Sequence, residues 1–176
     1  MSIHSARYQK TRRAVIIAVM AALYFVLSAL FKIPVGGNIK LDLGYIVLMV
    51  SAVLMGAVPA ALVGGIGAAL ESLLMSQRGI SPGWILMNII VGILCGLVLY
   101  KRRESSAKQL VIASCIIVPL SMIPAVAVKT LIDCAMYSLA LAAKIPTAIV
   151  ALAADSAVML IMGLPLAVAL KDRVRL

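Results

Sequence analysis

Charged residues are scarce in this chain: Asp, Glu, Lys and Arg make up 12% of its 176 residues, against about 25% in a typical soluble domain. Hydrophobic residues make up 64%, and a soluble domain of this size has too much surface relative to its volume to bury them all. The same hydrophobicity excludes a disordered chain. The composition therefore excludes a soluble globular enzyme and indicates an integral membrane protein with almost no mass outside the bilayer.

Residues that carry metal, redox or nucleotide chemistry are equally few. His4 is the single histidine and lies in a polar N-terminal tail, which excludes a histidine-based metal site or catalytic triad. Cys95, Cys115 and Cys134 lie in apolar sequence without a CxxC pair and are interpreted as small buried hydrophobes. No Walker A motif is present, so we expect no ATP hydrolysis, metal or cofactor in this chain.

The formal net charge of +10 comes from 16 cations against 6 acids. Eleven of the cations lie in three short segments between apolar stretches, which is typical of cytoplasmic loops rather than of a nucleic-acid-binding face. The three basic clusters are Arg7, Lys10, Arg12 and Arg13; Lys101, Arg102, Arg103 and Lys108; and Lys171, Arg173 and Arg175.

A bilayer core of about 30 Å needs about 20 helical residues, and the apolar stretches predict six spans in one all-α membrane domain covering residues 1–176. Gly56 and Pro59 separate the second span from the third. Pro119 and Pro124 predict a kink or a re-entrant break in the fifth. With six spans, all three basic clusters and both termini lie in the cytoplasm. The predicted spans are 14–33, 42–57, 59–77, 83–100, 109–128 with helical continuation to 143, and 146–170.

Polar residues of the predicted spans and loops gather in the outer half of the protein, over an apolar inner half. This pattern predicts a binding cup open to one side rather than a pore, which needs polar residues through its full depth. The candidate ligand-binding residues are Asn38, Lys40, Tyr45, Glu71, Arg78, Trp84, Asn88, Lys129, Asp133, Tyr137 and Asp155.

Simpler explanations exist for some of these candidates. Lys129 and Asp133 are four residues apart and could neutralise each other on one helix face. Trp84 lies at interfacial depth, where an aromatic anchor needs no ligand. Glu71 and Asp155 have no cation within one helical turn, so each needs a partner from another segment or a ligand.

Small residues spaced four apart on the first span, Ala14, Ala18 and Ala22, would let another helix approach closely. Such a face serves packing within the chain or contact with a second membrane protein. The first outer loop, Ile33-Pro-Val-Gly-Gly-Asn-Ile-Lys40, is rich in Pro and Gly. It precedes Leu43-Gly-Tyr-Ile and Met55-Gly-Ala-Val-Pro-Ala-Ala-Leu-Val-Gly-Gly65, and the chain closes with Ile145-Pro-Thr, Asp155 and Gly163-Leu-Pro165.

These features together resemble the substrate-binding S components of energy-coupling factor (ECF) vitamin transporters, over essentially the whole chain. The resemblance implies that the protein captures a vitamin or related micronutrient at the outer face. It then docks on a transmembrane coupling subunit joined to two cytoplasmic ATPases, which use the ATP. It further implies that Ala14, Ala18 and Ala22 form the docking face and that the loop with Gly36, Gly37, Asn38 and Lys40 acts as a lid.

The resemblance implies a multi-pass protein of a bacterial plasma membrane, whose ligand contacts come from the last three helices and the outer loops. Only 5% of the residues are aromatic, so the chain does not point to thiamin, riboflavin or biotin. Its Lys, Asp, Asn and Tyr residues suit a pantothenate-, pyridoxine- or folate-type compound. The alternative is a structural six-span scaffold without a ligand, while a lipid-phosphate enzyme lacks its acidic residues at the cytoplasmic side.

Overall fold

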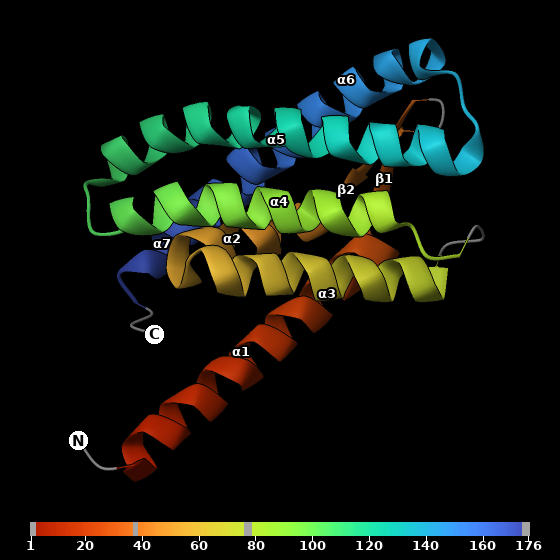
Figure 1. The fold of residues 1–176 in the computed structure, drawn as a ribbon. Coiled ribbons are helices and arrows are strands. Elements are labelled where there is room, and N and C mark those ends of the chain that lie inside the picture. Colours follow the sequence, from red (N-terminus) through yellow and green to blue (C-terminus); the bar gives the residue numbers. More distant parts are fainter. Residues whose placement is uncertain (1–2, 37–38, 76–78, 174–176) are drawn as a thin grey trace.

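The computed structural model describes residues 3–36, 39–75 and 79–173, which form one helical bundle with a small β-hairpin (Figure 1). Nearly all of these residues are helical. The elements are α1 (Ile3–Leu30), β1 (Lys32–Gly36), β2 (Ile39–Asp42), α2 (Gly44–Met55), α3 (Ala57–Met75), α4 (Pro82–Leu99), a 3-10 turn (Tyr100–Arg102), α5 (Ala107–Tyr137), α6 (Leu141–Val158), a π-helical turn (Met159–Gly163) and α7 (Leu164–Lys171).

Five helical segments among the described residues are long and apolar enough to cross a membrane. They are Tyr8–Leu30, Ala57–Met75, Pro82–Arg102, Ala107–Tyr137 and Leu141–Lys171. The last combines α6, the π-helical turn and α7. α2 is apolar too but has only 12 residues, or about 18 Å of helix. The protein is therefore a multi-pass membrane protein.

Two features differ from the sequence-based expectation of an all-α chain. The first helix ends at Leu30, and residues expected at the end of the first span and in the outer loop form the antiparallel hairpin β1–β2. Lys32 pairs with Asp42 and Ile33 with Leu41. A Pro- and Gly-rich loop has no alternating pattern, so nothing in its sequence indicated a strand pair.

The second difference concerns the re-entrant break that was one of two alternatives for the fifth span. α5 runs through Pro119 and Pro124 to Tyr137 as one helix, and residues 129–137 continue it as expected. Each proline removes one backbone hydrogen bond, but a continuous helix still satisfies the remaining polar groups in an apolar environment. Ser138 then ends the helix in a left-handed conformation, with φ of 51°, and α6 begins at Leu141, ahead of the expected start of the last span at residue 146.

Small residues bring α3 and α4 into direct backbone contact. A Cβ atom on Gly92 would lie 2.8 Å from the backbone of Ala60, and one on Gly96 would lie 2.5 Å from the Cα atom of Ala57. The Gly92-x3-Gly96 motif is thus used inside the chain. Gly56, with φ of +90°, makes the turn that separates α2 from α3.

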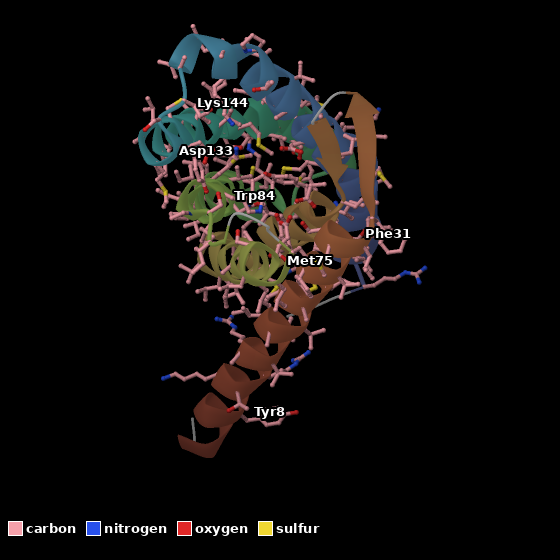
Figure 2. The ribbon with its side chains drawn as sticks, turned by 90° about the vertical axis from the view of Figure 1, so that its right-hand side faces the viewer. Tyr8, Phe31, Met75, Trp84, Asp133 and Lys144 are labelled. Carbon is pink, nitrogen blue, oxygen red and sulfur yellow. The ribbon has the colours of Figure 1, made fainter. Side chains whose placement is uncertain are left out.

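The N-terminal half of α1 stands away from the bundle, as both views show (Figures 1 and 2). Ala14, Ala18 and Ala22 are exposed along this helix. Tyr24 and Ser28, nearer its end, are completely buried against the bundle. One helix therefore has an open small-residue stripe and a polar buried segment.

The described residues of the three basic clusters lie toward one end of the bundle. Figure 1 shows both termini and the connection between α4 and α5 on the same side. Contacts between residues of two clusters tie this end together: the Arg103 guanidinium donates to the Lys171 carbonyl at 3.4 Å, and the Lys171 ammonium donates to the Ser105 carbonyl at 3.0 Å.

Candidate ligand-binding cavity

A cavity of about 670 Å³ opens between the end of α3, the beginning of α4, the end of α5 and the beginning of α6. These helix ends are the ones opposite the basic connection between α4 and α5. The cavity is lined by Asp42, Glu71, Ser72, Met75, Ser81, Trp84, Met87, Val126, Lys129, Thr130, Asp133, Leu139, Ala140, Ala143, Lys144, Thr147, Ala148, Ala151 and Asp155.

Four of the six acidic residues of the chain meet at this cavity. All four residues are buried, with exposed fractions of 3% for Asp42, 6% for Glu71, 7% for Asp133 and 4% for Asp155. Burying carboxylates in an apolar bundle is costly unless they find partners. Their convergence on one cavity therefore indicates a functional site rather than a packing solution.

Two of these carboxylates, from Asp42 and Glu71, meet at Ser28 of α1. The Ser28 hydroxyl lies 2.8 Å from Asp42 Oδ2 and 2.8 Å from Glu71 Oε2. It has one hydrogen, so it donates to one carboxylate at a time. The backbone N–H of Gly44 donates to Asp42 Oδ1 at 2.8 Å, and Trp84 Nε1 donates to Glu71 Oε2 at 2.8 Å. These contacts join α1, the hairpin, α3 and α4 at the cavity wall.

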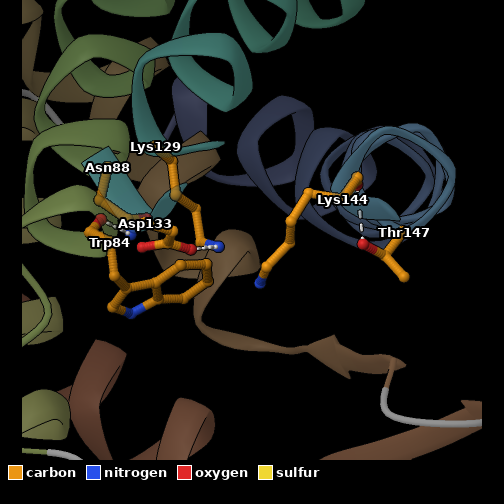
Figure 3. Close-up of polar contacts among 6 residues, drawn as sticks. All are labelled: Trp84, Asn88, Lys129, Asp133, Lys144 and Thr147. Atoms are coloured by element: carbon orange, nitrogen blue, oxygen red, sulfur yellow. Dashed lines mark hydrogen bonds and ion pairs between the residues drawn. The ribbon is translucent and has the colours of Figure 1, made fainter. Parts of the chain in front are cut away.

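Asp133 is held by an ion pair with Lys129 at 2.9 Å, one turn away on α5. The Lys129 side chain is 29% exposed, and both residues line the cavity. Figure 3 shows the pair beside the Trp84 ring, with Lys144 extending toward the same space from α6. The pairing that the sequence allowed is thus present, and it lies within the site.

Asp155 differs from the other three carboxylates. Among the residues that the structure describes, its side chain makes no hydrogen bond and no ion pair. It lies on α6 three turns from Lys144, on the same face of the helix.

Trp84 is supported from behind by three buried side chains. The Tyr45 ring meets the Trp84 ring edge-on, with centroids 6.2 Å apart at 89°. The Asn88 amide donates to the Trp84 carbonyl at 2.9 Å and accepts from the Tyr24 hydroxyl at 2.8 Å. Tyr45, Asn88 and Tyr24 are fully buried, so they position the indole rather than line the cavity.

The structure brings five of the predicted site residues to the cavity: Glu71, Trp84, Lys129, Asp133 and Asp155. Tyr45 and Asn88 form the layer behind. Tyr137 is the last residue of α5 and is not among the lining residues. Asn38 and Arg78 lie outside the described residues, and Lys40 is described only as part of the β2 backbone.

Sequence reasoning missed Asp42, Ser28, Lys144 and Thr147. Asp42 could have been predicted from the sequence, because every acid outside the basic clusters lines the cavity. Lys144 could have been predicted as well, because it is one of the few cations outside those clusters. Ser28 could not have been predicted, since one hydroxyl in an apolar helix is ordinary.

Across the described ranges, no group of three or more His, Cys, Asp and Glu side chains is arranged to hold a metal ion.

This sequence and fold are similar to those of known proteins. The family model described as "ECF-type riboflavin transporter, S component" matches residues 8–172. The chain is similar to the crystal structure of FolT bound with folic acid, with a TM-score of 0.64 and 19% identity over 93% of this chain and 94% of that one. It is also similar to the S-component for biotin from an ECF-type ABC transporter, with a TM-score of 0.68 and 16% identity over 98% and 95%. No curated protein sequence matches the chain.

Proposed function

From the premise that this chain belongs to the S-component family of ECF-type riboflavin transporters, we propose that it captures a small vitamin-like molecule in the cavity beside Trp84. Members of this family are transporter subunits and not enzymes. The observation that carries the proposal is the convergence of four carboxylates, two lysines and one indole on a cavity within an otherwise apolar bundle.

The size and lining of the cavity suit this role. Small-molecule sites occupy about 300–1,000 Å³ and combine apolar walls with a few placed polar groups. The cavity of about 670 Å³ has Met75, Met87 and Val126 among its apolar walls and Ser72 and Thr130 as neutral hydrogen-bonding groups. A scaffold without a ligand would have no use for these buried charges, which disfavours that alternative.

We propose six spans, with the short helix α2 as the second, and both termini in the cytoplasm of a bacterial cell. The three basic clusters gather at the end of the bundle opposite the cavity, and cytoplasmic loops are enriched in Lys and Arg. In this orientation the cavity opens toward the outside. The hairpin β1–β2 ends at Asp42, a lining residue, and is suited to act as a lid over the entrance.

Delivery of the ligand requires partners. We propose that α1 docks on a transmembrane coupling subunit joined to two ATPases, through Ala14, Ala18 and Ala22. All three alanines are exposed on the helix that stands away from the bundle. Small residues allow close approach of a partner helix in lipid, where no hydrophobic driving force brings helices together.

The ligand can be tested directly, because Trp84 is the only tryptophan of the chain and lines the cavity. Purified protein would be titrated with riboflavin, folic acid, biotin, pantothenate and pyridoxine while Trp84 fluorescence is recorded, and isothermal calorimetry would check for optical artefacts. We expect saturable binding of one compound with a submicromolar Kd. Failure of every compound to bind would contradict the proposed function.

A further inference from the structure

Asp155 is the one carboxylate at the cavity that no described residue of the protein holds. Asp42 and Glu71 contact Ser28, and Asp133 pairs with Lys129. Asp155 is only 4% exposed, and its side chain lines the cavity and makes no hydrogen bond or ion pair within the described part of the chain. A carboxylate that is removed from water needs hydrogen-bond donors to offset its lost hydration.

The surroundings of Asp155 offer it little help. The charged residues that line the cavity with it are three further acids, Asp42, Glu71 and Asp133, and only two cations, Lys129 and Lys144. Of the two cations, Lys129 is engaged with Asp133 at 2.9 Å. The site therefore has an excess of negative charge near Asp155, and a molecule that enters the cavity can supply the missing donors.

The lining residues of α6 place opposite charges at the two ends of this wall of the cavity. Lys144, Thr147, Ala148, Ala151 and Asp155 all line the cavity, at the spacing of one helix face. Lys144 and Asp155 are 11 residues apart, or about 16 Å along the helix axis. Thr147, Ala148 and Ala151 lie between them, and the Thr147 hydroxyl already donates to the Lys144 carbonyl at 2.8 Å. Small side chains therefore line this part of the wall, and they leave room for a ligand. The face thus runs from a cation near the beginning of α6 to an anion deeper in the bundle.

Resting on the proposed function, we propose that Asp155 determines specificity by accepting hydrogen bonds from the inner end of the ligand. This end carries N–H or O–H donors and is uncharged or cationic, as in an aminated heterocycle. The opposite end carries an acidic or hydrogen-bond-accepting group and lies near Lys144. An extended ligand of about 16 Å would contact both residues.

The test uses the compound that binds the wild-type protein in the titration above. Asp155→Asn keeps the size of the side chain but replaces one acceptor oxygen with a donor group. We expect its Kd to rise roughly 10- to 100-fold, because a hydrogen bond to a charged group is lost. Asp172→Asn, at an exposed position at the end of α7, is the matched control and should bind like the wild type.

A second measurement separates recognition from folding. Without ligand, Asp155→Asn should have an unchanged or higher Tm, because the variant replaces a buried carboxyl group that has no hydrogen-bond partner among the described residues. With ligand, the increase in Tm seen for the wild type should be reduced. A structural role for Asp155 would instead lower the Tm without ligand.

Two outcomes would contradict the inference in different ways. If the wild type binds one compound and Asp155→Asn binds it within twofold, Asp155 does not recognise the ligand and the proposed function stands. If no compound binds the wild type, the proposed function fails and the inference fails with it. A fall in Tm of ligand-free Asp155→Asn would also overturn the inference.

Discussion

The Ser28 hydroxyl of α1 lies 2.8 Å from the Glu71 carboxylate of α3, in the buried layer directly behind the cavity. The same hydroxyl contacts Asp42 at 2.8 Å, so a single side chain connects α1 with two carboxylates of the site. Ser28 is therefore a support of the cavity rather than an ordinary helix residue.

Replacing Ser28 with Ala should destabilise the protein by about 1–3 kcal/mol, because two buried carboxylates lose a shared partner. Thermal unfolding in detergent would measure this as a lower Tm. Ser114→Ala is the matched control: Ser114 is equally buried, but its hydroxyl bonds to the Leu110 carbonyl of its own helix at 2.8 Å. Equal Tm values for the two variants would show that the Ser28 contacts contribute nothing.

The ion pair between Lys129 and Asp133 predicts a characteristic double-mutant result. Lys129→Met leaves the Asp133 carboxylate buried without its cation and should cost about 1–3 kcal/mol, less than in a fully buried pair because Lys129 is partly exposed. Adding Asp133→Leu should restore much of the loss. Unfolding of the two single variants and the double variant gives the coupling energy. Additive effects would mean that the pair is not coupled.

Ala18→Trp should abolish uptake in vesicles that contain the complete transporter, while the Kd for ligand in detergent stays within about twofold of wild type. A bulky ring on the exposed stripe blocks close approach of a partner helix. Because this variant adds a second tryptophan, calorimetry rather than fluorescence should measure its Kd. Val19→Trp, at a neighbouring exposed position on a different face of α1, serves as the control. Loss of binding together with uptake would contradict the docking assignment.

Gly96→Ala should destabilise the protein by about 1–3 kcal/mol through overpacking. The added Cβ would lie 2.5 Å from the Ala57 Cα atom, and both are part of closely packed helices that cannot move independently. Ala153→Val adds bulk at an exposed position of α6 and should leave the Tm nearly unchanged. If Gly96→Ala has the Tm of the wild type, α3 and α4 are not in direct backbone contact.

Much of the candidate site could be predicted because a charge within an apolar helix is rare and its depth is readable from the sequence. Glu71, Lys129, Asp133 and Asp155 stood out for this reason, and all four line the cavity. Asp42 was passed over because it stood at the edge of a predicted span, and its position depends on the hairpin register that pairs it with Lys32. That register is a tertiary outcome without a local sequence signal.

The helices themselves followed from hydrophobicity, but their ends did not. Pro119 and Pro124 suggested either a kink or a re-entrant break in the fifth span, and α5 is one helix without such a break. The tendency of proline to break a helix is outweighed here by the requirement that backbone groups in an apolar bundle be hydrogen-bonded. Similarly, Tyr24 resembled any aromatic residue of a membrane helix, and only the fold shows that it holds Asn88 behind Trp84.

The length of α1 adds a consequence to the contacts of Ser28 with Asp42 and Glu71. Ser28 and Ala14 are 14 residues apart on one uninterrupted helix, so about 21 Å of helix separates them. One uninterrupted helix therefore connects the wall of the cavity with the exposed small-residue stripe.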